Sequence, residues 1–273
     1  MSRGGGSSRW PSEGKVDAVK VHVGRVRSHR KPRVTARVAR GAACAHNAGV
    51  TFPHPPPAAR AALAELCARD PDLAGIEPAA GPLPWRLRPA GFCGLFQAIV
   101  GQQISNQAAA AIWRRVAALP GATTPEGLLA LDDDALRGAG LSRPKIAHAR
   151  ALAAAFAEGR LETAALAALD DEEAVAAIAS VRGLGRWTAE VYLLFALGRA
   201  DVFPAADLAL AASAAHLKQL DARPGPAALR ALAEPWRPHR ALAARLLWHH
   251  WRHVTGRAAM DDLVIIPAPE PAA

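Results

Sequence analysis

The stretch that decides the fold is Val181-Arg-Gly-Leu-Gly-Arg-Trp-Thr-Ala-Glu190. Before it, residues 171–180 begin with acidic side chains, continue with apolar ones, and have Asp170 in place as a cap, so they predict a helix. After it, residues 187–197 predict a second helix that ends at Gly198. Two glycines with one apolar residue between them leave room only for a tight hairpin between these helices.

Such a hairpin suits a phosphate group. Gly183 and Gly185 carry no Cβ, so the backbone can approach an anion closely. The amides that open the second helix point toward an anion at the positive end of the helix dipole. A glycine pair alone is a weak signal, however, because many helix pairs turn on glycine.

A carboxylate makes the pattern more specific. Asp201-Val-Phe-Pro-Ala-Ala-Asp207 follows the second helix and places Asp207 twenty positions after Trp187. Hairpin, aromatic residue and carboxylate in this order resemble the helix-hairpin-helix DNA glycosylases, and among them the 3-methyladenine DNA glycosylase II type, over roughly residues 60–255. The resemblance implies an all-α fold of two helical lobes with the active cleft between them. It also implies a set of residues that bind the DNA backbone: Gly183, Leu184, Gly185, Arg186 and Thr188.

Asp207 is the expected catalytic residue. In the resembling family an aspartate at this place faces the sugar, where it stabilises the developing cation or orients the attacking water. Cleavage of a glycosidic bond through a sugar cation needs such a carboxylate. Asp207 also precedes a predicted helix over residues 207–220 and fits an N-cap, and one carboxylate can serve both roles.

The base pocket is expected to be aromatic. Trp248 matches the last tryptophan of the family pattern Trp-x-Pro-x-Arg…Trp, which begins here at Trp236, and Trp187 follows the hairpin. Aromatic faces attract a positively charged alkylated base once it has been flipped out of the duplex. Both tryptophans could instead be core residues. Val191 stands where some members have a tyrosine, and Tyr192 lies about 100° further round the helix.

The resemblance also predicts the reaction product. Trp187 stands where bifunctional members carry the lysine that forms a Schiff base, and without an amine covalent lyase chemistry has no nucleophile. The cysteines that hold an iron–sulfur cluster in some members are missing too. We therefore expect a monofunctional glycosylase that acts on duplex DNA with alkylated purines, such as 3-methyladenine and 7-methylguanine, and leaves an abasic site. A mismatch or oxidised-base glycosylase of the same superfamily and a noncatalytic helix-hairpin-helix DNA-binding module are the alternatives.

A second segment is a candidate for DNA contact. Apolar residues recur at helical spacing from Phe92 to Val116 and predict one long helical stripe. Gly101-Gln-Gln-Ile-Ser105 lies within the stripe and resembles the family segment that borders the minor groove. Gln103 or Ile104 is therefore a candidate for the wedge that fills the gap left by a flipped base, and an ordinary glycine kink is the alternative.

The positive charge of the chain is concentrated at one end. Residues 1–50 hold 11 of the 33 basic residues and 2 of the 24 acidic ones, so the remaining residues carry 22 of each and the net charge of +9 belongs to this segment. The overall charge is thus no argument that the folded part binds DNA. Composition predicts a disordered basic arm over residues 1–56, a glycosylase domain over 57–256 and a flexible tail over 257–273.

No metal or organic cofactor is expected. Cys44, Cys67 and Cys93 are odd in number and far apart, which predicts buried thiols rather than a disulfide framework or a metal cluster. His249 and His253 share a helix face but lack a third ligand. A monovalent cation held by the hairpin carbonyls, as in relatives, stays open. The absence of a long apolar segment and of a signal core argues against a membrane span and against secretion. We expect a cytoplasmic monomer of bacterial type that associates with the nucleoid through DNA.

Overall fold

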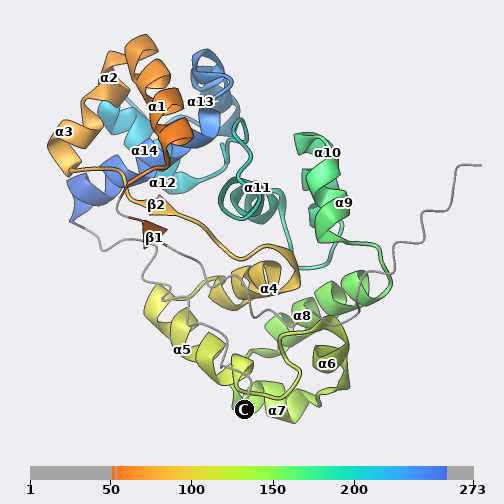
Figure 1. Cartoon of the computed structure of the whole chain (residues 1–273). Coiled ribbons are helices and arrows are strands. Elements are labelled where there is room, and N and C mark those ends of the chain that lie inside the picture. Colours follow the sequence, from red (N-terminus) through yellow and green to blue (C-terminus); the bar gives the residue numbers. More distant parts are fainter. Residues whose placement is uncertain (1–50, 53, 257–273) are drawn as a thin grey trace, which may run out of the picture. The chain divides into compact units, whose positions relative to one another are not determined.

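The computed structural model describes residues 51–52 and 54–256 of the chain. These residues form fourteen α-helices, one 3₁₀ turn and two short strands (Figure 1). The helices before the hairpin are α1 (Pro57–Arg69), α2 (Pro71–Ala74), α3 (Ile76–Ala80), α4 (Gly91–Gly101), α5 (Asn106–Ala117), α6 (Pro125–Ala130), α7 (Asp133–Gly138), α8 (Arg143–Ala157), α9 (Thr163–Ala168) and α10 (Asp171–Ala179). The elements after it are α11 (Arg186–Phe195), α12 (Leu208–Leu217), α13 (Pro226–Leu232), η1 (Glu234–Trp236) and α14 (Arg240–Thr255). The predicted all-α class is confirmed.

The two strands form a single short ladder. β1 (Thr51–Phe52) pairs antiparallel with β2 (Trp85–Arg86), with Thr51 opposite Arg86. Two residues of the segment that the sequence predicts as a disordered arm are therefore paired in a strand. Residues 1–50 and 53 of that arm and the predicted tail, residues 257–273, lie outside the described residues.

The helices on either side of the hairpin form where the sequence predicts them. The side chain of Asp170 accepts a hydrogen bond from the amide of Glu173, and the Glu173 carboxylate accepts one from the amide of Asp170. This reciprocal capping box satisfies two amides at the start of α10, where its acidic first turn also suits the helix dipole. α11 begins one residue earlier than predicted, directly after Gly185.

The predicted stripe from Phe92 to Val116 is wrong as a single helix. α4 ends at Gly101, Gln103 has a φ of 58°, and α5 begins at Asn106. The break has a local cause, because the hydroxyl of Ser105 accepts a hydrogen bond from the amide of Ala108 and caps a new helix. The spacing of apolar residues carries no information about such a cap, so the apolar pattern of the sequence continues across the break between the two helices.

The described residues bury two hydrophobic clusters. The first joins side chains of α4 to α11, in which α4 and α6 pack against α8 (Figure 1). The second joins side chains of α1 to α3 with those of α11 to α14, in which α12 packs against α14. α11 contributes to both, giving Ala189, Tyr192 and Leu193 to the first and Val191, Leu194 and Phe195 to the second. Two separate buried clusters are consistent with the predicted arrangement in two helical lobes.

The sequence predicts buried thiols and no segment that crosses a membrane. Cys93 is disulfide-bonded, which contradicts its prediction as a thiol, whereas Cys67 is free. Among the helices of residues 51–52 and 54–256, none combines the length and the apolar character needed to cross a membrane.

Candidate active site

Asp207 lies at the start of α12 and is nearly buried, with 7% of its surface exposed. Its Oδ1 atom accepts hydrogen bonds from the amides of Ala209 at 2.8 Å and Leu210 at 2.9 Å. The carboxylate is therefore an N-cap, as its place in the sequence predicts. This role fixes the backbone of Asp207 and the position of its Oδ1 atom.

The same carboxylate holds both tryptophans that the sequence assigns to the pocket. Nε1 of Trp187 donates to Oδ2 of Asp207 at 2.8 Å, and Nε1 of Trp248 donates to Oδ1 at 3.2 Å. Within the described residues Oδ2 has no other donor, so it keeps a lone pair for a water molecule or a sugar. Residues from three helices, far apart in the chain, thus meet at one acid.

A cavity of about 140 Å³ lies beside these tryptophans. Its apolar and neutral wall consists of Leu83, Pro84, Trp187, Val191, Phe195, Ala209, Trp248, Trp251 and Thr255. Asp207 is not part of that wall; the indole N–H groups of Trp187 and Trp248 connect it to the cavity. The rings of Trp248 and Phe195 stack with centroids 5.5 Å apart. The cavity opens beside α11, the helix shared by both clusters, and the flat faces of its aromatic side chains suit a planar base.

Val191 and Tyr192 are consecutive residues of α11, but one faces the pocket and the other faces the core. Val191 lines the cavity, whereas Tyr192 is buried in the first cluster, and its hydroxyl accepts a hydrogen bond from the amide of Gly91 at 2.7 Å. The sequence prediction that Tyr192 points away from Val191 agrees with this geometry. The ring that some relatives place here is absent from the wall, so Val191 leaves it less aromatic.

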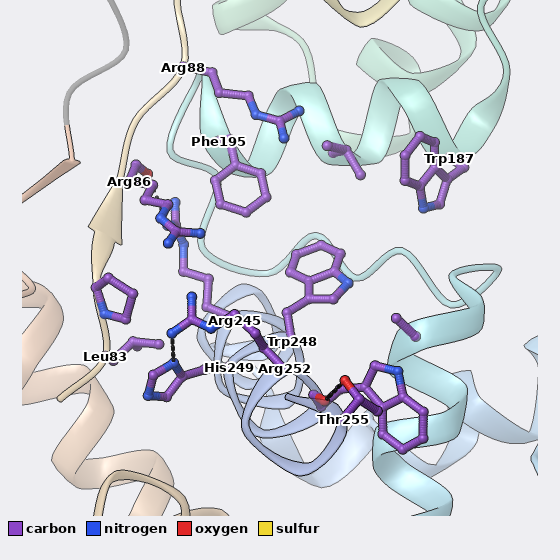
Figure 2. Close-up of a pocket in the computed structure, with 14 residues that line it drawn as sticks. Leu83, Arg86, Arg88, Trp187, Phe195, Arg245, Trp248, His249, Arg252 and Thr255 are labelled. Carbon is purple, nitrogen blue, oxygen red and sulfur yellow. Dashed lines mark hydrogen bonds between the residues drawn. The ribbon is translucent and has the colours of Figure 1, made fainter. Parts of the chain in front are cut away.

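The rest of the wall is cationic, which the sequence analysis did not predict. Its members are Arg86, Arg88, Arg245, Arg252 and His249, and Figure 2 shows the guanidinium groups of the first three around the ring of Phe195. A signal for two of them existed in the sequence. Arg245 and Arg252 lie three residues before and four after Trp248, and therefore share its helix face.

Arg245 is a buried member of this cationic wall, with 6% of its surface exposed. Its guanidinium lies 4.2 Å from the ring centre of Trp85 and 4.4 Å from that of Phe195, and it donates to the carbonyl oxygens of Arg86 and Leu194. Burial, helped by the charges of neighbouring arginines, lowers the pKa of Arg245 to about 9. Arg245 therefore remains charged at neutral pH but is poorly solvated.

His249 supports Arg252. Its Nε2 lies 2.9 Å from the carbonyl oxygen of Gly81, and its Nδ1 lies 3.0 Å from a guanidinium nitrogen of Arg252. A carbonyl can only accept and a guanidinium can only donate, so His249 carries its proton on Nε2 and is neutral. Burial lowers the pKa of His249, which agrees with this assignment. No group of three metal-binding side chains occurs in the part of the chain that the structure describes.

The hairpin before α11 is held from two sides. Leu184 is buried in the first cluster, and the side-chain amide of Gln102 donates to the carbonyl oxygen of Gly183 at 2.8 Å. Gly183 has a φ of 91°, in the left-handed region that favours glycine. Gly185, the residue before α11, makes no side-chain cap within the described residues, so the first amides of α11 keep their donors for another partner.

Two of the residues predicted to bind the DNA backbone are already engaged by the protein. The guanidinium of Arg186 pairs with Glu172 and with the buried Glu190, and the side chain of Thr188 is buried. Contacts from these two residues to a phosphate would therefore come from their main-chain amides rather than from their side chains.

The predicted wedge residues lie in the loop between α4 and α5. Gln103 is exposed, and Ile104 is an exposed apolar residue, with 37% of its surface accessible. The neighbouring Gln102 ties this loop to the hairpin at Gly183. The two segments predicted to contact DNA are thus directly connected by a hydrogen bond.

Comparison with known families agrees with this arrangement. The model of the HhH-GPD superfamily of base excision DNA repair proteins matches residues 96–238, more than half of the chain. The chain belongs to this superfamily. Its matched region includes the hairpin and Asp207 and ends before Trp248.

Curated relatives are about one third identical to this chain over the aligned residues. DNA-3-methyladenine glycosylase 1 of Schizosaccharomyces pombe is 33% identical over 158 residues, which cover 56% of this chain and 69% of that protein. DNA-3-methyladenine glycosylase 2 of Escherichia coli is 32% identical over 164 residues, which cover 56% of this chain and 55% of that protein. The match to the putative DNA-3-methyladenine glycosylase YfjP of Bacillus subtilis, 32% identical over 45% of this chain, covers 43% of that protein.

Solved structures of the superfamily extend the likeness to the fold. The S. pombe 3-methyladenine DNA glycosylase in complex with abasic DNA superposes with a TM-score of 0.63 at 28% identity, covering 73% of this chain and 98% of that chain. The DNA-3-methyladenine glycosidase of Bacillus halodurans gives a TM-score of 0.64 at 29% identity, covering 79% and 99%.

Proposed function

We propose that this protein is a monofunctional DNA glycosylase of base excision repair. It flips alkylated purines, of the 3-methyladenine and 7-methylguanine type, from duplex DNA and hydrolyses the N-glycosidic bond to leave an abasic site. The observation that carries the proposal is the set of hydrogen bonds by which Asp207 holds both Trp187 and Trp248 beside the cavity. The names of the relatives support it further.

The chemistry follows from this geometry. A base stacked between the aromatic side chains would place its sugar near Oδ2 of Asp207, the oxygen with a free lone pair. There the carboxylate would stabilise positive charge on the sugar, or orient the water that attacks it. Its four donors keep it in position before the substrate arrives, which lowers the reorganisation needed in the transition state.

DNA binding would use the hairpin and the loop tied to it. The amides that open α11 suit a backbone phosphate, and Gly183, Leu184 and Gly185 bring the main chain close to it. We propose Ile104, with Gln103 beside it, as the wedge that fills the gap in the base stack. A binding module would need only the hairpin, so the shared hydrogen bonds of Asp207 favour an enzyme. Because hairpin and pocket belong to one chain, a monomer suffices, acting in the cytoplasm at the nucleoid.

The product is expected to be an intact strand with an abasic site. The described residues contain two lysines, and both have partners: Lys145 donates to the carbonyl oxygen of Val100, and Lys218 pairs with Asp70 and Asp72. Neither stands at the position of Trp187, where lyases carry their nucleophile. Borohydride should therefore trap no covalent adduct, and strands should break only after alkali. A trapped band that Lys218→Ala or Lys145→Ala abolishes would show that the enzyme is a lyase.

Gly185→Ala is expected to weaken binding of damaged and undamaged duplex alike, on the order of tenfold for one lost hydrogen bond to a charged phosphate. Gly185 has a φ of −98°, and an added Cβ would meet no atom of the described residues within 4 Å, so the fold should tolerate alanine. The measurement is a titration of both duplexes beside a thermal melt. Unchanged affinity for both duplexes would mean that the hairpin is only a structural turn.

The function itself is tested by base release from duplexes that carry single defined lesions. Release of an alkylated purine with an alkali-sensitive site left behind is the expected result. Activity confined to mismatched or oxidised bases would favour the alternative glycosylase class, and binding without release would favour a noncatalytic module. Adding and removing monovalent salts of different cation size tests whether the hairpin also holds a cation.

A further inference from the structure

The segment 201–207, which carries Asp207 at its end, is fixed to α14 at both ends. At its end, Oδ1 of Asp207 accepts a hydrogen bond from Nε1 of Trp248. At its start, Asp201 accepts two hydrogen bonds from the guanidinium of Arg240, from Nε to Oδ1 at 2.9 Å and from Nη2 to Oδ2 at 3.0 Å. Both donors belong to α14, eight residues and therefore about 12 Å apart along the helix axis. These two contacts set how the segment lies along α14.

The contact at Asp201 also provides the cap of α14. Among the described residues, His239 before the helix makes no side-chain cap. Instead, the amide of Ala241 donates to the carbonyl oxygen of Ala200 at 3.0 Å, and the amide of Arg240 donates to Oδ1 of Asp201 at 3.5 Å. A carboxylate at this place also suits the positive end of the helix dipole. The start of α14 and the start of the segment 201–207 are therefore held together.

The segment between the two contacts is packed too closely to absorb a shift. Phe203 is buried, and its ring meets that of Trp236 edge to face, with centroids 5.9 Å apart. The amide of Asp207 donates to the carbonyl oxygen of Pro204 at 2.9 Å and closes a turn. Because close-packed interiors transmit strain, a displacement at Asp201 would reach Asp207.

Arg240 holds Asp201 with a geometry that a second arginine does not share. Its side chain is 11% exposed, and its Nη1 also pairs with Glu234 at 3.0 Å, so two carboxylates fix its guanidinium. Arg237 donates to Oδ2 of Asp201 at 2.8 Å, but its side chain is 54% exposed. A planar fork on both oxygens fixes the position and the orientation of a carboxylate, which a single exposed contact does not.

We propose that Arg240 is a positioning residue for base release. Through its fork on Asp201 it determines where the carboxylate of Asp207 lies in the site. Arg240 does not line the cavity beside the two tryptophans, so it acts through Asp201 and not on the base. A shift of about 1 Å in a reacting group can slow a reaction about 10²-fold. This inference rests on the proposed glycosylase function and adds a residue outside the cavity to it.

Arg240→Gln is expected to slow single-turnover base release about 10–100-fold, while the affinity for the same duplex changes by less than about twofold. The rate falls because the carboxylate of Asp207 is misplaced. The affinity stays because the hairpin and the loop proposed to bind DNA are untouched. Both are measured on a duplex with a lesion that the wild-type protein releases, at saturating enzyme for the rate and well below the melting temperature of the variant.

Three further variants separate positioning from a general loss of stability. Arg240→Lys keeps the charge and can reach one oxygen of Asp201, so it should recover part of the lost rate. Arg237→Gln removes only the exposed partner of Asp201 and should release the base within a few-fold of the wild-type rate. Arg150→Gln breaks an ion pair between α8 and Asp133 of α7, so it should lower the melting temperature and leave the rate unchanged.

Asp201→Asn tests the route by which Arg240 acts. Alone, it should slow base release as Arg240→Gln does, because the charged pair is lost from its other side. The double variant should be no slower than the slower single variant, since both substitutions remove the same contact. Losses of rate that multiply in the double variant would overturn the route through Asp201.

The remaining outcomes are decisive as well. A wild-type rate in Arg240→Gln overturns the inference and leaves the glycosylase function standing. An affinity that falls as far as the rate, or an equal loss of rate in Arg150→Gln, overturns it too, because the residue would then support DNA binding or the fold in general. A wild-type protein that releases no base from any lesion overturns the proposed function itself. If Arg240→Gln fails to fold, Asp201→Asn is judged by the same rate and affinity.

Discussion

Asp207→Asn is expected to bind lesion DNA with near wild-type affinity while releasing the base roughly 10²–10⁴-fold more slowly. Asparagine is as good an N-cap as aspartate, so α12 should keep its start. What disappears is the negative charge beside the sugar, together with one acceptor for the indole N–H groups of Trp187 and Trp248. Single-turnover base release and a thermal melt of the same preparation measure the two effects separately.

Asp170→Asn is the matched control for this variant. Asp170 caps α10 through the same kind of bond, in which its Oδ1 accepts from the main-chain amide of Glu173, and it does not line the cavity. It should alter the thermal melt slightly and leave base release unchanged. If Asp207→Asn releases the base within a few-fold of the wild-type rate, Asp207 has no part in the chemistry and is a cap only.

Gly183→Ala is expected to destabilise the fold by roughly 2–4 kcal/mol, because two independent causes act at one residue. The φ of 91° disfavours any side chain, and a Cβ built there would lie 2.1 Å from Cγ and 2.6 Å from Cβ of His148. The whole side chain of His148, and not only its ring, would have to move, because the clash reaches its Cβ. For a domain of this size the melting temperature should fall by about 4–16 °C.

Gly185→Ala, two residues further on, is the control for Gly183→Ala. It introduces the same methyl group at an ordinary φ with open space around it, so its melting temperature should match that of the wild type. Adding His148→Ala to Gly183→Ala should restore the part of the stability lost to the clash and leave the part due to φ. A Gly183→Ala protein with the same melting temperature as the wild type would show that the hairpin accommodates the methyl group without loss of stability.

The sequence predicted the elements whose signals are local. The cap at Asp170, the glycine hairpin and the cap at Asp207 each depend on neighbouring residues, and each forms as expected. A family resemblance predicted that Trp187 and Trp248 line one pocket, because spacing along the chain does not reveal that α11 and α14 face each other there. The hydrogen bonds of both tryptophans to Asp207 were not predicted.

The cationic wall and the short strand pair were not predicted, for a related reason. Arg86 and Arg245 are 159 positions apart in the sequence, and only the tertiary fold brings them to the wall of one cavity. Two-residue strands carry no alternation that a pattern could detect. At the loop after α4, a single capping hydroxyl, Ser105, overrides an apolar period that continues on both sides.

The hydrogen bonds that Asp207 shares with two tryptophans have a consequence for how new substrate ranges could evolve in this lineage. A substitution at Trp187 or Trp248 reshapes the cavity and, in the same mutational step, releases an oxygen of the carboxylate. Variants with such a substitution would lose catalytic turnover before the cavity accommodates a new base. The effects of the substitution on the cavity and on the carboxylate would not be additive. Val191 and Arg252 are among the residues that border the cavity without a hydrogen bond to Asp207, so substitutions there can change the cavity and leave the carboxylate in place.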